Sequence, residues 1–198
     1  MTIGVLAFQG DVIEHMQALR LLGAEAQEVR SIDDLEEVKG LIIPGGESTV
    51  IGKFLEETGL RKAIIDRCTN GKFPIYGTCA GAILLAREVF SVAAIHESRL
   101  RPLGLMDITI ERNAYGRQTE SFEAYLTLDL PSGKEEISGI FIRAPKVVQI
   151  GKSVSVLARY EGLPVACMEG NFLVSTFHPE LSTKPSFLHK FFSGFVEK

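Results

Sequence analysis

Short apolar runs alternate with stretches of helical periodicity through the first half of the chain. Residues 3–8 and 41–43 are almost continuously apolar, as expected for strands buried on both faces of a parallel sheet. Apolar residues then recur at spacings of four, three and three, forming one stripe of a predicted helix: Val12, Met16, Leu19 and Leu22. Gly23 follows, where a glycine commonly ends a helix.

The alternation of strand and helix continues to residue 89. Ser31 and Asp34 have the spacing of a helix N-terminus, where a serine and an acidic side chain three residues on each satisfy a backbone N–H. Further strands are predicted at 24–29 and 73–76, and further helices at 31–38, 47–57, 60–69 and 82–89. This order predicts a three-layer α/β fold with an open, mostly parallel sheet flanked by helices.

The second half of the chain is dominated by predicted strands. They cover residues 107–112, 121–130, 137–143, 147–150, 154–160, 164–168 and 172–177. A Gly170-Asn171 hairpin signal separates the last two, so we expect antiparallel strands to extend the sheet into a mixed one. A last helix at 185–197 carries an aromatic stripe typical of a core-facing surface, whereas residues 90–105 are the least regular. We expect residues 1–198 to form a single domain.

Composition narrows the class of protein without indicating an activity. The 198 residues are 45% hydrophobic and 23% charged, with a net charge of −4, which is typical of a folded globular chain. No cluster of Lys and Arg favours a nucleic-acid partner, and no apolar run approaches the ~20 residues of a membrane-spanning helix. No signal peptide is evident, because the first basic residue is Arg20, and we therefore expect a cytoplasmic protein.

The chain has three cysteines, Cys68, Cys79 and Cys167. Their odd number and wide spacing fit neither a disulfide framework nor a CxxC metal site, and we predict neither a metal nor a cofactor. Cys68 and Cys167 fall in apolar segments, which indicates packing residues.

Cys79 lies in the strongest local motif, Gly-Thr-Cys-Ala-Gly at residues 77–81, between a predicted strand and a predicted helix. Small residues two before and two after a nucleophile allow the tight turn of a nucleophile elbow. The positive end of the following helix also favours a reactive thiolate. The same small residues suit simple close packing of helix against sheet, so the motif alone leaves both interpretations open.

A second candidate is His178, which directly follows a predicted strand and has Glu180 two positions later. In an extended chain these two side chains point to the same side, so the acid can orient the imidazole toward a nucleophile. The remaining histidines, His15, His96 and His189, lie off the apolar stripes or in irregular sequence, and we expect them to contact solvent.

The third candidate is a Gly45-Gly46 turn at the end of the 41–43 strand. Such a turn lets backbone N–H groups converge, and the donor of Gly46 with that of Ala80 is suited to an oxyanion hole. A phosphate-binding loop and a plain strand-to-helix turn are the competing interpretations, although the phosphate-loop lysine is absent. Together the three candidates suit acyl transfer through a thioester.

These motifs also carry a family resemblance. Residues 45–49 (GGEST), 77–81 (GTCAG) and 178–180 (HPE) resemble the triad glutamine amidotransferases. Further segments are similar to the glutaminase subunits of pyridoxal 5′-phosphate synthase: 7–10 (AFQG) with Glu14-His15, 112–113 with 116–118, 121–123, and 141–145 (FIRAP). The resemblance implies a flavodoxin-like fold of the amidotransferase type. It also implies hydrolysis of L-glutamine to glutamate, with ammonia passed to a separate synthase subunit in a hetero-oligomeric complex that builds the vitamin B6 cofactor.

Residue roles follow from the resemblance position by position. Cys79 matches the nucleophile, His178 the base, and Glu180 the acid that orients it. The positions implied to hold glutamine are Gly46, Glu47, Ser48, Arg112, Ile142 and Arg143. Gln9 and Gly10 match a loop near the oxyanion hole and the partner surface.

Three other functions remain open from the sequence. The chain could be a related triad glutaminase that serves another synthase, or a γ-glutamyl peptidase of the same fold. It could also be a non-catalytic regulatory subunit, because fold alone does not specify function. Release of ammonia from glutamine in the presence of the synthase separates an enzyme from a regulatory subunit.

Overall fold

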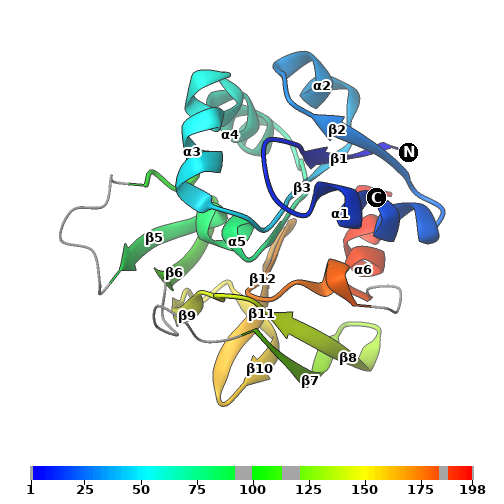
Figure 1. Cartoon of the computed structure of the whole chain (residues 1–198), viewed down its shortest axis with the longest axis vertical. Helices are drawn as coiled ribbons and strands as arrows, with labels where there is room; N and C mark the ends of the chain where they lie inside the picture. Colours follow the sequence, from blue (N-terminus) through cyan, green and yellow to red (C-terminus); the bar gives the residue numbers. More distant parts are fainter. Residues whose placement is uncertain (1, 92–99, 113–120, 183–186, 198) are drawn as a thin grey trace.

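A computed structural model describes residues 2–91, 100–112, 121–182 and 187–197 of the chain. Its centre is a seven-stranded sheet (Figure 1). From one edge to the other the strands are β10 (Ser155–Tyr160), β11 (Leu163–Glu169), β12 (Phe172–Ser175), β4 (Ile75–Thr78), β3 (Gly40–Ile43), β1 (Thr2–Leu6) and β2 (Glu25–Val29). The pairs from β12 to β2 are parallel, and β10 and β11 continue the sheet in antiparallel fashion. The predicted mixed sheet is therefore confirmed.

The other strands form two small sheets. Strands β5 (Ala86–Ser91), β6 (Met106–Arg112) and β9 (Lys146–Ile150) make one, and β7 (Phe122–Leu130) pairs with β8 (Gly133–Phe141) in the other. The expectation that the strands of the second half would extend the central sheet is thus wrong for β6, β7, β8 and β9. The alternation of apolar and polar residues along a strand shows which face is buried, but it does not show which other strand pairs with it.

The helix predicted at 82–89 is also wrong in its second half. Helix α5 (Ala80–Leu85) ends after six residues, and β5 begins at Ala86. β5 pairs in parallel with β6, with Val89 opposite Ile110. The pairing is with residues outside the 82–89 segment, so the local sequence pattern does not reveal it.

Five further helices flank the central sheet: α1 (Val12–Leu21), α2 (Ile32–Glu37), α3 (Ser48–Glu57), α4 (Leu60–Asn70) and α6 (Phe187–Val196). The capping box at Ser31 is present, because its side chain accepts the N–H of Asp34 and the Asp34 carboxylate accepts the N–H of Ser31. The aromatic stripe of α6 packs inward as predicted, with Phe192 fully buried. In the described part of the chain no helix has the length and apolarity needed to cross a membrane.

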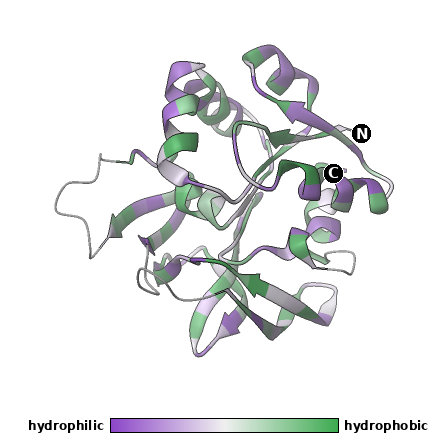
Figure 2. Ribbon diagram, in the orientation of Figure 1, coloured by the Kyte–Doolittle hydropathy of each residue, from purple (hydrophilic) through white to green (hydrophobic). Residues whose placement is uncertain are grey.

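Successive residues of the central strands pack into two hydrophobic clusters, one on each face of the sheet. In β3, Leu41 and Ile43 join the cluster shared with α2, α3 and α4, whereas Ile42 joins the cluster shared with α1, α6 and the β7–β8 pair. Figure 2 shows hydrophobic residues along the inner strands and hydrophilic residues on the outward turns of the surrounding helices. The sheet is therefore buried on both faces, which fixes the ends of its strands in space.

Two glycines allow α5 to lie directly against the carboxyl ends of β3 and β4. A Cβ on Gly81 would lie 2.0 Å from the carbonyl oxygen of Ile43, and one on Gly77 would lie 2.5 Å from the carbonyl carbon of Gly81. These neighbours are backbone atoms, which cannot rotate away as a side chain can. The small residues of the 77–81 motif are thus required by packing around Cys79.

We predict that Gly81→Ala lowers the free energy of unfolding by roughly 1–3 kcal/mol or more, because the added methyl group forces the backbones of α5 and β3 apart. Gly194→Ala in α6 is the matched control: its Cβ would meet no atom within 4 Å, so the better helix propensity of alanine leaves stability unchanged or raises it by up to ~1 kcal/mol. Urea unfolding of both variants tests this, and equal effects would contradict the close-approach argument.

Candidate active site

Cys79 occupies a strained turn between β4 and α5. Its backbone has φ 46° and ψ −99°, a conformation that L-residues rarely adopt, and its N–H donates to the carbonyl of Ser175 in β12 at 2.8 Å. Strain of this kind costs about 1–3 kcal/mol and persists only where the surroundings enforce it. The predicted elbow is present, and its side chain is turned to the carboxyl edge of the sheet, next to the Ile142 carbonyl at 3.9 Å.

His178 and Glu180 follow β12 at the same edge. The Nδ1 of His178 donates to Oε1 of Glu180 at 2.9 Å, and both side chains are buried. The local geometry differs from the expected extended chain: β12 ends at Ser175, and Glu180 lies in a short 3-10 helix, η1 (Pro179–Leu181). The predicted contact forms all the same. The backbone N–H of His178 also donates to the carbonyl of Ile140 in β8, which fixes the ring's attachment point.

The charges of this pair are set by their neighbours. Burial alone would lower the pKa of His178, but hydrogen bonds with Asp11, Cys79 and Glu180 outweigh burial and raise it to about 12. Burial would raise the pKa of Glu180, yet the charge and hydrogen bond of His15, followed by those of His178, hold it well below its usual range. The resting site therefore contains an imidazolium between the sulfur and an ionised carboxylate.

Asp11 is a site residue that sequence reasoning missed. Its Oδ2 lies 3.0 Å from Nδ1 of His178, so a second carboxylate shares the proton donated to Glu180. Asp11 stands at the N-cap position of α1 but makes no side-chain cap there. The sequence carries no signal for this role, because an acidic residue just before a helix is normally interpreted as its N-cap.

The prediction that His15 and His189 contact solvent is wrong. Both are fully buried, and His15 connects to Oε1 of Glu180 at 3.3 Å, to Oγ1 of Thr78 at 3.1 Å and to Nε2 of His189 at 2.7 Å. His15 stands three residues after Val12 and four before Leu19, so it shares the buried face of α1 with them and does not lie off the stripe as expected. The sheet, α6 and η1 cover this helix. Hydrogen bonds to other buried polar groups compensate for the lost contact with water.

The Gly45-Gly46 turn follows β3 and contacts the loop that contains Gln9 and Gly10. The side chain of Gln9 accepts the N–H of Glu47 at 3.0 Å, and a Cβ on Gly10 would lie 1.7 Å from the carbonyl oxygen of Gly45. A Cβ on Gly45 would in turn lie 2.3 Å from the His178 ring. The turn is therefore packed between the Gln9–Gly10 loop and the imidazole. Gly46 itself is exposed and has φ 136°.

The positions implied to hold glutamine form two groups. Arg112 is buried at the end of β6, and its Nη2 lies 3.5 Å from Glu47 Oε1 and 3.2 Å from Thr49 Oγ1 at the start of α3. Ile142 and Arg143 follow β8. The carbonyl of Ile142 faces the Cys79 sulfur, and Arg143 is exposed with a positive φ of 45°.

Ala80 and Ser48 are the first residues of α5 and α3, respectively, and both are buried. A helix leaves the N–H groups of its first turn without intrahelical partners. The Ala80 N–H therefore stands beside the nucleophile, as the predicted oxyanion hole needs.

The predicted roles of Cys68 and Cys167 as packing residues agree with their positions, since both thiols pack against or within a hydrophobic cluster. Burial raises the pKa of each thiol to about 12, which keeps it protonated at neutral pH. Several residues of interest lie outside the described residues: His96, Asn113, Gly116, Arg117 and Gln118.

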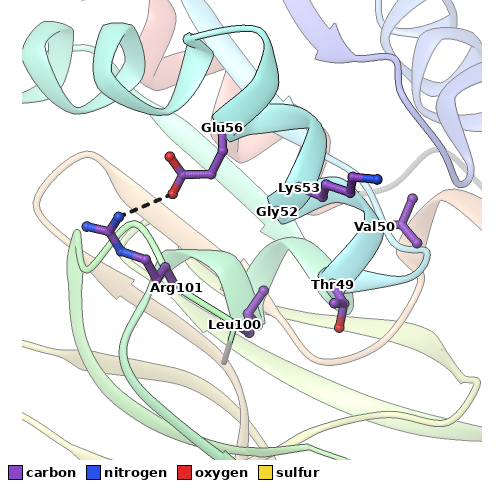
Figure 3. A pocket seen from close by; sticks show the side chains of 7 residues that line it. All are labelled: Thr49, Val50, Gly52, Lys53, Glu56, Leu100 and Arg101. Atoms are coloured by element: carbon purple, nitrogen blue, oxygen red, sulfur yellow. Dashed lines mark ion pairs between the residues drawn. The ribbon is translucent and has the colours of Figure 1, made fainter. Parts of the chain in front are cut away.

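A groove of about 310 Å³ runs beside α3 (Figure 3). Glu56 and Arg101, which line the groove, form an ion pair at 3.7 Å. Thr49, which accepts a hydrogen bond from Arg112, lines the groove at the start of α3. None of Cys79, His178 and Glu180 lines it. The groove thus borders the contact between Thr49 and Arg112 but not Cys79.

Within the described ranges, one set of three metal-ligand types converges, with donor atoms of Asp11, His178 and Glu180 within 4.8 Å of one another. The Nδ1–H of His178 already bonds both carboxylates. This pattern orients an imidazole for proton transfer, because a metal ligand nitrogen would have to give up that proton.

The chain is similar to known proteins over nearly its whole length. Residues 5–198 match the SNO glutamine amidotransferase family. A relative from Pseudothermotoga lettingae, named pyridoxal 5′-phosphate synthase subunit PdxT, is 50% identical over 97% of this chain and 94% of its own length. A protein of the same name from Thermus thermophilus is 50% identical over 96% of this chain and 95% of its own.

Solved structures agree with these relatives. A crystal structure described as a glutamine amidotransferase has a TM-score of 0.88 and 45% identity, and covers 99% of both chains. A PurLQS structure from Thermotoga maritima, at 19% identity and a TM-score of 0.68 over 98% of this chain and 94% of that one, shares the fold. The predicted flavodoxin-like α/β fold of the amidotransferase type is confirmed.

We predict that a diazo-ketone analogue of glutamine labels Cys79 well before Cys68 or Cys167. Only Cys79 has an imidazolium beside its sulfur, whereas burial keeps the other two thiols protonated. Peptide mapping after limited exposure measures the order. Label on Cys68 or Cys167 at a comparable rate would show that the elbow does not select the reactive thiol.

The two carboxylates on His178 are expected to contribute unequally. Glu180 is fully buried while the Asp11 side chain is 32% exposed, so solvent screens the Asp11 contact. Glu180→Gln should lower the glutaminase kcat by about 10²–10⁴-fold, and Asp11→Asn by no more than about tenfold. His178→Ala should cost the most, because the ring itself carries the proton. An Asp11→Asn loss as large as that of Glu180→Gln would reverse the assignment.

Proposed function

The chain belongs to the SNO glutamine amidotransferase family, and we propose that it acts as the glutaminase subunit of a pyridoxal 5′-phosphate synthase through a thioester on Cys79. Its reaction is the hydrolysis of L-glutamine to L-glutamate and ammonia. The separate synthase subunit receives the ammonia for vitamin B6 synthesis. The observation that carries the catalytic assignment is the convergence of a strained cysteine at the N-cap position of α5 with a buried His178–Glu180 pair.

The first half-reaction acylates the enzyme. The thiolate of Cys79 attacks the side-chain amide carbon of glutamine, and the carbonyl π electrons move to oxygen to form a tetrahedral oxyanion. The N–H groups of Gly46 and Ala80 stabilise this oxyanion. His178 then gives its proton to the amide nitrogen, the C–N bond breaks, and ammonia leaves a γ-glutamyl thioester behind.

The second half-reaction returns the enzyme to its resting state. Neutral His178 takes a proton from water, the hydroxide attacks the thioester carbonyl, and a second oxyanion collapses with loss of the Cys79 thiolate. Glu180 holds the ring orientation and stabilises the imidazolium in both halves. Glutamate then dissociates.

Glutamine is held by two groups of residues on either side of the nucleophile. A zwitterionic amino acid requires cationic or N–H donors for its carboxylate and an acceptor for its ammonium. Arg112 and Arg143 supply the guanidinium groups. The substrate also contacts the turn of Gly46, Glu47 and Ser48, and the backbone at Ile142. Support for this arrangement comes from Arg112 beside Glu47 and from the Ile142 carbonyl beside the Cys79 sulfur.

Gln9 and Gly10 connect the partner surface to the oxyanion hole. Gln9 accepts the N–H of Glu47, and Gly10 packs against the Gly45 carbonyl. A synthase contact that shifts this loop would therefore turn the Gly45-Gly46 peptide. Losing one oxyanion donor typically costs about 10²–10³ in rate, so the loop couples docking to glutaminase activity.

We also propose that residues 1–198 form one glutaminase domain that works in the cytoplasm. The nucleophile follows β4 and the base follows β12, two adjacent strands of the same sheet, which supports a single domain. All three cysteines are free thiols, which fits a reducing compartment.

We expect Cys79→Ala to lower glutamine hydrolysis by about 10⁴-fold or more, since no thioester forms without the sulfur. The variant should fold, bind the synthase, and support pyridoxal 5′-phosphate formation when ammonium salt replaces glutamine. Cys167→Ala is the matched control and should keep glutamine-dependent synthesis.

Glutamate release and product formation, measured with the mixed subunits, separate the possible functions. Substantial hydrolysis by folded Cys79→Ala would exclude the thioester mechanism. Failure of ammonium to restore synthesis would point to a role for this subunit other than ammonia supply.

A further inference from the structure

A buried chain of polar side chains extends from Glu180 to helix α6. Oε1 of Glu180 lies 3.3 Å from Nε2 of His15 in α1, and Nδ1 of His15 lies 2.7 Å from Nε2 of His189 in α6. Both histidine side chains are inaccessible to solvent. The proposed chemistry uses neither of them.

The proton on His15 can be assigned from its neighbours. Oε1 of Glu180 is an ionised carboxylate oxygen and only accepts hydrogen bonds. An unprotonated Nε2 at this distance would place two lone pairs against each other without intervening water, so Nε2 of His15 carries a hydrogen directed toward Glu180 and Thr78. Nδ1 of His15 lies within hydrogen-bond distance of Nε2 of His189, and this contact holds the His15 ring with its Nε2 toward Glu180.

His189 is suited to hold the His15 ring in place. Burial, followed by the charge of His15, lowers its pKa to about 3 against a smaller opposing effect of Glu180, so the ring is neutral at physiological pH. The edge of the Tyr76 ring packs against it at 5.6 Å between centroids, which restricts its orientation. Apolar residues would fill these positions without the desolvation cost of two imidazoles.

We propose that His15 is a positioning residue that holds the Glu180 carboxylate against His178, and that His189 holds the His15 ring in the orientation that donates to Glu180. The inference rests on the proposed role of Glu180 in the triad. Without the second donor, the carboxylate is free to rotate about its side-chain bonds, and His178 loses the orientation needed for proton transfer.

Two polar substitutions of His15 separate positioning from packing. The amide nitrogen of His15→Gln reaches the place of Nε2 and keeps the donor to Glu180, whereas that of His15→Asn reaches only the place of Nδ1. We expect His15→Asn to lower the glutaminase kcat by about 10–100-fold with KM unchanged, the range typical of a lost hydrogen bond to a charged group. His15→Gln should recover most of the wild-type kcat.

A double-mutant cycle identifies the route of the effect. If His15 acts through Glu180, His15→Asn should add almost no loss of kcat in a Glu180→Gln background, because the carboxylate it orients is already gone. A purely structural role would give losses that multiply. Assembly with the synthase and ammonium-dependent synthesis should stay at wild-type level in every variant.

The outcomes distinguish this inference from the proposed function. A wild-type kcat in Glu180→Gln alone would overturn the triad role itself. If Glu180→Gln is impaired, the inference is overturned by a wild-type kcat in His15→Asn, by equal losses in His15→Asn and His15→Gln, or by losses that multiply in the double variant. A selective, non-additive loss in His15→Asn supports it.

Discussion

The site depends on one buried negative charge, the carboxylate of Glu180. Leaving such a charge unpaired in a protein interior costs several kcal/mol, so the surrounding fold has to supply hydrogen-bond donors from fixed directions. His178 supplies one from the segment after β12, and His15 supplies another from α1. His189 ties the second donor to α6. The packing of two helices on one face of the sheet is thereby coupled to the orientation of the catalytic imidazole.

The opposite side of the site depends on close backbone approach. Gly81 lets α5 touch the end of β3, which forces Cys79 into its strained turn, and Gly45 lets the neighbouring turn touch the His178 ring. The nucleophile, the base and the proposed oxyanion donors are therefore fixed relative to one another by backbone contacts. The Gln9 contact to the backbone of Glu47 is a point at which a partner can alter this arrangement.

The sequence predicted the features that local motifs encode. The elbow at Cys79 and the His178–Glu180 contact arise within a few residues of a strand end, so local spacing makes them candidates, and the family resemblance supplies their roles. The local pattern of β5 predicts a helix because it does not reveal the pairing with β6, in which Ala86 lies opposite Met106. His15 is expected at the surface although it stands three residues after Val12 and four before Leu19, on the face that these residues share, and its polar partners in other elements leave no local signal. Asp11 was missed because an acid before a helix normally caps it.

Interception of the thioester tests the central claim most directly. Hydroxylamine is a stronger nucleophile than water, and added to the mixed subunits turning over glutamine it should divert the acyl group from Cys79 to γ-glutamylhydroxamate. The account predicts that ammonia release continues while glutamate falls and the hydroxamate rises by an equal amount. Glutamate that stays equal to ammonia at every hydroxylamine concentration, with no hydroxamate formed, would contradict a covalent mechanism at this cysteine.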